Sequence, residues 1–236
     1  VPPESSALSF QLSQAVSAGQ SRLEKIQSIP LVGIIFKSKS PSCGMKSAKV
    51  YLESGHCEGK TNGIFADLCQ KKFPLLPMEE EGRLEDPWLR ENFVMQIFAY
   101  DLFEKFKNNS PSLNDLIQFH TKNKFLLQAK DEKLYRQLGN IVANREMLSL
   151  DTILEQYEYN FKTAIAKKSS IKRNRNVLEH LSGFFKNELS SEEKNILHTQ
   201  INDYAAKIIP LIVPLSTIEL YATKYKISYL LQQTFL

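Results

Sequence analysis

The chain has 236 residues, of which 42% are hydrophobic and 24% are charged, and its formal net charge at neutral pH is only +4. The hydrophobic fraction is ample for one large or two small packed domains. The small net charge permits nucleic-acid binding without arguing for it, because the distribution of charge matters more than its sum.

Cysteine usage and hydropathy exclude two further classes of protein. The three cysteines are an odd number and lack the spacing of a secreted disulfide scaffold. No signal peptide opens the chain, and no apolar run is long enough to span a bilayer. We therefore expect a cytoplasmic protein whose thiols are free or bound to metal.

The first third of the chain has a mixed α/β pattern. Apolar residues at helical spacing predict a first helix, short apolar runs predict strands, and Asn62-Gly63 marks the start of a second helix. The expected elements are a helix over 8–26, strands over 31–36 and 49–52, a helix from 62 to 71, and a strand over 73–78 that Pro74 and Pro77 weaken.

After Glu85 the pattern is helical almost throughout. Asp86 and Pro87 suit the N-cap and first position of a helix, and the stretch 108–111 ends it. Capping sequences open further helices at 112–115 and 190–193, and apolar stripes predict helices over 150–165 and 171–187. Pro210 and Pro214 bracket a break before a last helix to Tyr225. The predicted fold is mostly α, with an N-terminal partial α/β domain of short parallel-type strands (residues 1–85) and an all-α bundle (residues 86–236).

One cysteine stands in a chemically suggestive place. Residues 33–45 read GIIFKSKSPSCGM, an apolar strand that ends in a polar turn presenting Cys43. Ligands of open α/β sheets bind just past the carboxyl ends of strands, and nearby cations such as Lys37 and Lys39 favour the thiolate form. The alternative is an inert turn cysteine. Cys57 lies in a polar loop without an evident role, and Cys69 on the second helix is expected to be a buried apolar residue.

The segment KSKSPSCG at 37–44 resembles the last cysteine motif of the thiouracil-desulfurase-like domain. The rest of the chain resembles the YbgA-like helical domain, and the two are fused in bacterial tRNA 4-thiouridine desulfidases. In that family three cysteines hold a 4Fe-4S cluster whose open iron takes the sulfur of a thiolated pyrimidine. The resemblance implies that Cys43 is one cluster ligand and that Ser40 or Ser42 moves protons, although turn formation explains both serines equally well.

The sequence also departs from that family. The family opens with a Cys-Leu-Leu-Gly-like motif and an Arg-Tyr-Asp-Gly-like motif and also has a Cys-Pro-Glu motif, and none of these occurs in this sequence. The chain therefore supplies one of three expected ligands and no counterpart of the catalytic glutamate. A lone thiolate cannot hold a four-iron cluster. We expect this chain not to catalyse desulfidation alone and to bind no cluster stably unless an upstream segment or a partner chain completes the site.

A run of cations between two predicted helices is a candidate RNA contact. Residues 167–176 contain five cations and no acid. Three of them, Lys172, Arg173 and Arg175, lie at the N-terminus of the predicted helix, where the helix dipole is already positive and disfavours cations. Such an arrangement suits phosphate, whereas the alternative is a solvated turn. The family carries a similar basic stretch leading into an Asn-Val-Leu-x-His pattern. The residues expected to contact RNA here are Lys168, Lys172, Arg173, Arg175, Asn176 and His180.

A second candidate is FHTKNK at 119–124, which resembles the family's Phe-His-Thr-Arg-His-Lys motif with Asn123 in place of the second histidine. Helical spacing places His120 and Lys124 on one face, where with Lys122 they would contact phosphate or base. The alternative is a structural histidine among solvated lysines. We expect Lys37 and Lys39 to contact RNA as well.

Two functions therefore compete. The first is part of a tRNA 4-thiouridine desulfidase, in which water replaces sulfur at C4 of the base and the helical domain binds tRNA. The second is a non-enzymatic RNA-binding or protein-interaction module with a vestigial iron–sulfur domain.

Overall fold

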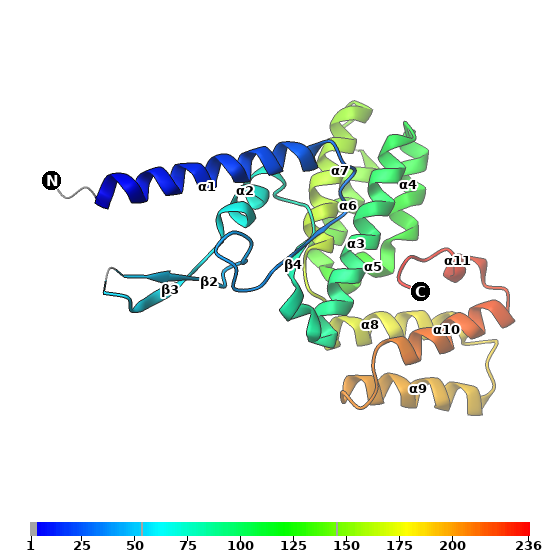
Figure 1. Cartoon of the computed structure of the whole chain (residues 1–236). Helices are drawn as coiled ribbons and strands as arrows, with labels where there is room; N and C mark the ends of the chain where they lie inside the picture. The colour runs from blue at the N-terminus through cyan, green and yellow to red at the C-terminus, as the bar shows by residue number, and fades with distance from the viewer. Residues whose placement is uncertain (1–3, 53, 145) are drawn as a thin grey trace. The chain divides into compact units, whose positions relative to one another are not determined.

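The structure is a computed structural model that describes residues 4–52, 54–144 and 146–236, with side chains from residue 13 onward. It divides after Asp101 into two compact units, Val1–Asp101 and Leu102–Leu236. The first unit contains short strands and the second is helical, which confirms the predicted fold class (Figure 1). Within the described residues, no helix is both long and apolar enough to cross a membrane.

The first unit is built around one parallel strand pair. Its elements are α1 (Glu4–Gln27), β1 (Ile34–Phe36), β2 (Ala48–Tyr51), β3 (Cys57–Thr61), α2 (Ile64–Lys72), β4 (Met78–Glu80) and the 3₁₀ helix η1 (Glu81–Glu85). β1 pairs with β4 in parallel, with Phe36 opposite Glu80, while β2 and β3 form an antiparallel hairpin. A small core of Leu23, Phe36, Ala66 and Cys69 packs beneath the strand pair.

Three predictions for this unit need correction. The strand expected over 73–78 begins only at Met78, because Phe73 caps α2 and the prolines at 74 and 77 cannot donate to a ladder. The strand expected over 31–36 is confined to the three residues that pair with β4. Cys57 lies at the start of strand β3 and not in a loop.

Helix α3 (Pro87–Asn108) begins in the first unit and ends in the second. Asp86 caps its start, as predicted, by accepting the N–H groups of Trp88 and Leu89. Both predicted capping boxes are present, at Ser112 with Asp115 and at Ser190 with Glu193. The further helices are α4 (Leu113–Lys122), α5 (Lys124–Lys130), α6 (Glu132–Ala143), α7 (Leu150–Ile165), α8 (Ile171–Ser182), η2 (Gly183–Phe185), α9 (Ser191–Ala205), α10 (Ile212–Lys224) and α11 (Ser228–Leu231).

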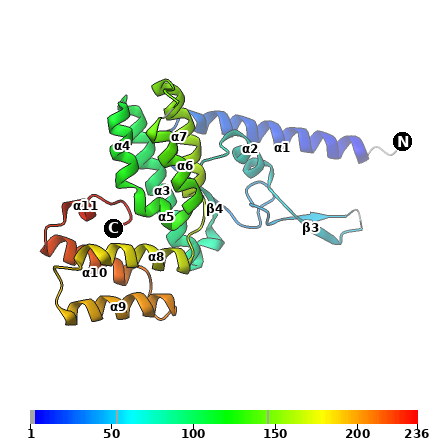
Figure 2. The ribbon, with the colours of Figure 1, turned by 180° about the vertical axis from the view of Figure 1, so that it is seen from behind.

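Two helix boundaries differ from the prediction. The helix expected to reach residue 187 ends at Ser182 and continues as the 3₁₀ turn η2. Pro214 does not interrupt the chain, because it lies in the first turn of α10, where its missing N–H leaves no helical hydrogen bond unmade. In both views α8, α9 and α10 lie side by side (Figure 2).

The centre of the helical unit combines aromatic packing with a buried ion network. Phe103 stacks on Phe161 with 5.3 Å between ring centroids. Beside them, the ammonium group of Lys162, whose side chain is 6% exposed, lies 2.5 Å from a Glu104 oxygen and 2.6 Å from a Glu158 oxygen. Although burial disfavours the charged form of Glu158, hydrogen bonds from Lys107 and Lys162 hold the pKa of this carboxyl below its usual value.

Removing the central cation of this network is expected to be costly. Lys162→Ala leaves Glu158 with Lys107 alone and removes the cation beside Glu104, and because both carboxylates are partly exposed we predict a loss of about 1–3 kcal/mol in the free energy of unfolding. Urea unfolding of the full chain measures it, with the exposed Lys133→Ala as the matched control. A loss no larger than that of the control would show that the network contributes little to stability.

Candidate functional site

The segment that follows β1 folds into a tight turn around Cys43. The hydroxyl oxygen of Ser40 accepts the N–H groups of Ser42 at 3.2 Å and of Cys43 at 3.1 Å, and the Ser40 carbonyl accepts the N–H of Gly44 at 2.8 Å. A serine that bonds the backbone two and three residues on is a common turn-forming device. The turn therefore fixes the backbone on both sides of the thiol.

Helix α2 fixes this turn from the other side. The N–H of Phe65 donates to the Ser42 carbonyl at 2.8 Å, the N–H of Ile64 to Pro41, and the N–H of Gly63 to Gly44 at 2.7 Å. A Cβ at Gly63 would lie 2.4 Å from the Ser42 carbonyl group, so only glycine permits this approach. The first N–H groups of α2 are thus used by the turn and are not available to a phosphate.

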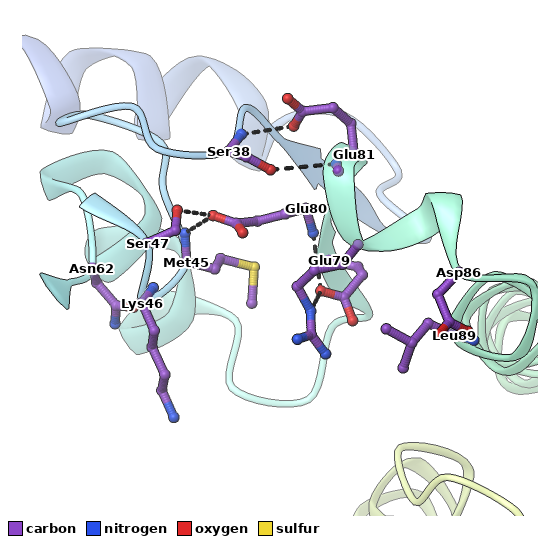
Figure 3. Close-up of polar contacts among 12 residues, drawn as sticks. Ser38, Met45, Lys46, Ser47, Asn62, Glu79, Glu80, Glu81, Asp86 and Leu89 are labelled. Carbon is purple, nitrogen blue, oxygen red and sulfur yellow. Dashed lines mark hydrogen bonds and ion pairs between the residues drawn. The ribbon is translucent and has the colours of Figure 1, made fainter. Parts of the chain in front are cut away.

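The carboxyl end of β4 supplies a buried carboxylate to the same turn. Glu80 is 3% exposed, and its Oε1 accepts the N–H of Met45 at 2.6 Å and the hydroxyl of Ser47 (Figure 3). The Ser47 oxygen in turn accepts the N–H of Lys39 at 2.8 Å. One carboxylate therefore joins the residues before and after the thiol to the parallel strand pair.

Glu81 completes the attachment at the solvent side. Its carboxylate lies 2.8 Å from the ammonium group of Lys37 and accepts the N–H of Ser38 at 2.7 Å. The hydrogen bond and charge of Glu81 raise the pKa of Lys37, while Lys37 lowers the pKa of Glu81. Lys37 is therefore paired with a carboxylate, which weakens the expectation that it favours a thiolate at Cys43. The exposed Lys39 has no such ion pair among the described residues.

The three thiols have different surroundings. Cys43 is half-buried and packs against the core that contains Cys69. Cys69 is buried, as predicted, and this burial together with the nearby Cys43 raises the pKa of its thiol to about 11. Cys57 is exposed on β3. Only Cys43 combines partial access with a rigid turn.

The residues present do not fit a four-iron cluster by themselves. No group of three or more His, Cys, Asp or Glu side chains in the described residues is placed to hold a metal ion. A cluster of this kind needs several thiolates around it. The geometry assigns Cys43 the role of a single ligand at most.

The basic run spans the loop before α8 and the start of α8, at the junction of two helices as predicted, but its cations make different contacts. The Arg173 guanidinium donates to the carbonyls of Ala129 at 3.2 Å and Lys168 at 2.7 Å, so it holds the loop together. Arg175 is paired with Glu179 at 2.8 Å. The side chains of Lys168 and Lys172 are exposed. They are better placed than the arginines for an RNA phosphate.

Two further predicted contacts lie on the outer side of α8. Asn176 and His180 are both exposed. His180 is thus not the packed core histidine that its neighbours in sequence would suggest, and it stays a candidate RNA contact.

The arrangement around His120 differs from the prediction. Asn123 separates α4 from α5, so His120 and Lys124 do not share the face of one helix. His120 bonds the Tyr157 hydroxyl at 3.1 Å and stacks on Tyr135, and burial lowers its pKa to about 4. A neutral imidazole offers a phosphate no charge.

The residues after His120 are split between the surface and the interior. Asn123 is fully buried and bonded to Phe119 and Thr234, whereas Lys122 is exposed. Lys124 is half-buried, with its ammonium group 5.3 Å from the Phe125 ring centroid. Among these residues Lys122 is the one best placed for a nucleic-acid contact.

Comparison with known proteins agrees with this division of the chain. Residues 10–81 match the family model described as 2-thiouracil desulfurase, and residues 124–236 match DUF1722, described as a protein of unknown function. Over 146 residues the chain is 26% identical to the uncharacterized protein YbgA of Escherichia coli strain K12, a match that covers 61% of this chain and 86% of that protein. No solved structure matches. The chain thus carries a 2-thiouracil-desulfurase-like domain and a DUF1722 domain, with YbgA as a homologue.

Sequence reasoning found the Cys43 turn but missed Glu80. The run Glu79-Glu80-Glu81 follows an expected strand, and a carboxylate just beyond a strand end was an available signal. What the sequence does not reveal is that β4 pairs with β1, which brings Glu80 opposite Phe36 at the end of the strand that leads into the turn.

The dependence of the turn on Glu80 can be measured at single amides. Glu80→Ala removes the acceptor of the Met45 N–H, so we predict faster hydrogen exchange at Met45 and a loss of about 1–3 kcal/mol in unfolding free energy. Glu81→Ala is the matched control, and it should speed exchange at Ser38 while leaving Met45 protected. Equal exchange at Met45 in both variants would contradict the role assigned to Glu80.

Proposed function

We propose that this chain is part of a tRNA 4-thiouridine desulfidase, in which the first unit presents Cys43 to an iron–sulfur centre and the helical unit binds RNA. The observation that carries the proposal is the rigid turn around Cys43, which lies inside the segment that matches 2-thiouracil desulfurase. The turn is anchored by α2 and by Glu80, as a preorganised ligand requires. The net reaction is hydrolytic: water replaces sulfur at C4 of the base, and hydrogen sulfide leaves.

In this proposal Cys43 is one thiolate ligand, and the others come from an upstream segment or a partner chain. Of the two candidate serines, Ser40 is occupied as the acceptor of two backbone N–H groups. The half-buried hydroxyl of Ser42 makes no hydrogen bond to another described residue. Ser42 is therefore the better candidate to pass a proton to or from the pyrimidine.

The second candidate function is a non-enzymatic RNA-binding or protein-interaction module. The small number of cluster ligands favours this function. Among the described residues, Cys43 is the one thiol that is both accessible and held in a turn, and no group of three or more His, Cys, Asp or Glu side chains is placed to hold a metal ion. Iron content separates the two functions.

The cluster proposal predicts that iron depends on one particular thiol. The protein is purified without oxygen together with the upstream segment or partner chain that supplies the other thiolates, and iron and acid-labile sulfide are measured before and after reconstitution. We expect bound iron that falls at least several-fold in Cys43→Ser, because that variant lacks the thiolate ligand. The exposed Cys57→Ser is the matched control and should retain iron. Full iron in Cys43→Ser would contradict the ligand assignment, and absence of iron from the parent protein with the other thiolates present would favour the non-enzymatic module.

The RNA proposal predicts a salt-dependent interaction at the loop before α8 and the first turn of that helix. Lys168→Glu with Lys172→Glu should weaken tRNA binding and lower the slope of log affinity against log salt by about one for each phosphate that the protein no longer neutralises. Arg173 is left intact because its guanidinium holds the loop. Lys133→Glu, an exposed lysine on α6, is the control. Unchanged affinity in the double variant would remove the loop from the RNA interface.

A further inference from the structure

The hairpin formed by β2 and β3 projects from the first unit with little cover. Both views show it extending away from α2 and β4 (Figures 1 and 2). All five residues of β3 are exposed, and Ala48 is the one buried residue of β2. Because a two-stranded hairpin by itself is at best marginally stable in water, such an element gains from a partner that covers it.

The hairpin places two lysines directly opposite each other. Lys49 on β2 pairs in register with Lys60 on β3, and like charges at opposed positions of an antiparallel pair are unfavourable. Both side chains are exposed, and within the described residues neither forms an ion pair. Glu58, the acid of β3, is the extra residue of a bulge and has no partner position on β2. An anion bound by both ammonium groups would replace their repulsion with attraction.

An accessible aromatic ring lies beside the two cations. Side chains alternate along a strand, so Tyr51 is on the same face of β2 as Lys49. The Tyr51 side chain is 58% exposed, and its ring is therefore open to a ligand. Ammonium groups for phosphate and an exposed ring for stacking are the two elements with which proteins hold single-stranded RNA.

The base of the hairpin is fixed to the Cys43 turn. A Cβ at Gly44 would lie 2.9 Å from the Ala48 nitrogen, so the turn and the start of β2 are in close contact. The N–H of Gly63 donates to the Gly44 carbonyl at 2.7 Å, and the N–H of Lys46 donates to Asn62 Oδ1 at 2.9 Å. RNA that is held on the hairpin would therefore have its next nucleotides close to the turn.

Two further lysines flank the turn and have a strained backbone. Lys39 and Lys46 are exposed, and their φ angles of 61° and 59° lie in the left-handed region that favours glycine. The side chain of Lys46 points away from Glu80 (Figure 3). This conformation alone does not identify a site, because Lys207 and Lys226 share it. It does mean that both charges can be removed with relief of strain.

We propose that this hairpin holds the RNA strand beside the Cys43 turn, with phosphates on its lysines and a base on its tyrosine. The surface, which we call the hairpin face, consists of Lys39, Lys46, Lys49, Tyr51 and Lys60. The proposal rests on the proposed function and assigns part of the RNA binding to the first unit, next to the thiol.

Two double variants remove charge without removing a favourable contact. Lys39→Gly with Lys46→Gly relieves the left-handed backbone, and Lys49→Thr with Lys60→Thr replaces a like-charge pair with residues that strands favour. We expect each to unfold at a urea concentration no lower than that of the parent chain. A loss of RNA binding would then not be a loss of folding. Lys72→Gln, which removes an exposed cation at the end of α2, is the matched control.

The experiment measures binding of the full chain to tRNA that contains 4-thiouridine, by fluorescence anisotropy at several salt concentrations. We expect each double variant to bind about fivefold more weakly or worse and to lower the slope of log affinity against log salt by about one to two. Tyr51→Thr should weaken binding at an unchanged slope, because it removes stacking and not charge. Lys72→Gln should match the parent chain.

Ethylation interference locates the contact on the RNA. Phosphates whose ethylation blocks the parent chain but not the double variants should lie within a few nucleotides of 4-thiouridine. Contacts that map to a distant part of the tRNA would overturn the placement of the hairpin face beside the substrate base.

The outcomes separate this proposal from the proposed function. If the double variants bind tRNA with the affinity and slope of the parent chain, the hairpin face is overturned, while binding that depends on Lys168 and Lys172 still supports RNA binding by the helical unit. Unchanged RNA binding with an altered oligomeric state by light scattering would overturn it in favour of a protein contact. Failure of the parent chain to bind tRNA overturns the RNA-binding function and the hairpin face together.

Discussion

The buried carboxylate of Glu80 is the interaction on which the candidate site depends. It reaches the turn because β4 pairs in parallel with β1, which brings Glu80 opposite Phe36 at the end of that strand. A buried charge is stable only if it is hydrogen-bonded, and Met45 and Ser47 meet that requirement. The same bonds that satisfy Glu80 hold the turn that carries Cys43, so the strand pair and the thiol form one structural element.

The helical unit depends on a different balance. Its interior buries Lys162 between Glu104 and Glu158, whereas Lys168 in the loop before α8 and Lys172 in the first turn of α8 are exposed. The net charge of +4 conceals this division between structural and exposed cations. Arg173 and Arg175 belong to the structural set, since they bond carbonyls and a carboxylate of their own unit. A basic run in a sequence thus overstates the charge that is available to a partner.

Local features of the fold could be predicted, and pairings distant in sequence could not. The capping boxes at Ser112 and Ser190 depend on residues three positions apart, and the structure confirms both. The Ser40 turn is equally local. By contrast, the bonds of Glu80, the bond of Arg173 to the Ala129 carbonyl and the contact of His120 with Tyr157 join segments far apart in the chain. Helical spacing also predicted that His120 and Lys124 lie on one helix, but α4 ends and α5 begins at Asn123. The buried side chain of Asn123 bonds Phe119 and Thr234 at this junction.

Photocrosslinking tests the central claim most directly, because 4-thiouridine in tRNA is itself a photoreactive base. The full chain is mixed with tRNA that contains this nucleoside, irradiated without oxygen, and digested to map the crosslinked peptide. If the turn around Cys43 receives the thiolated base, a crosslink falls within residues 37–47 and disappears with tRNA that carries uridine instead. Crosslinks confined to the helical unit, or none at all, would contradict the account.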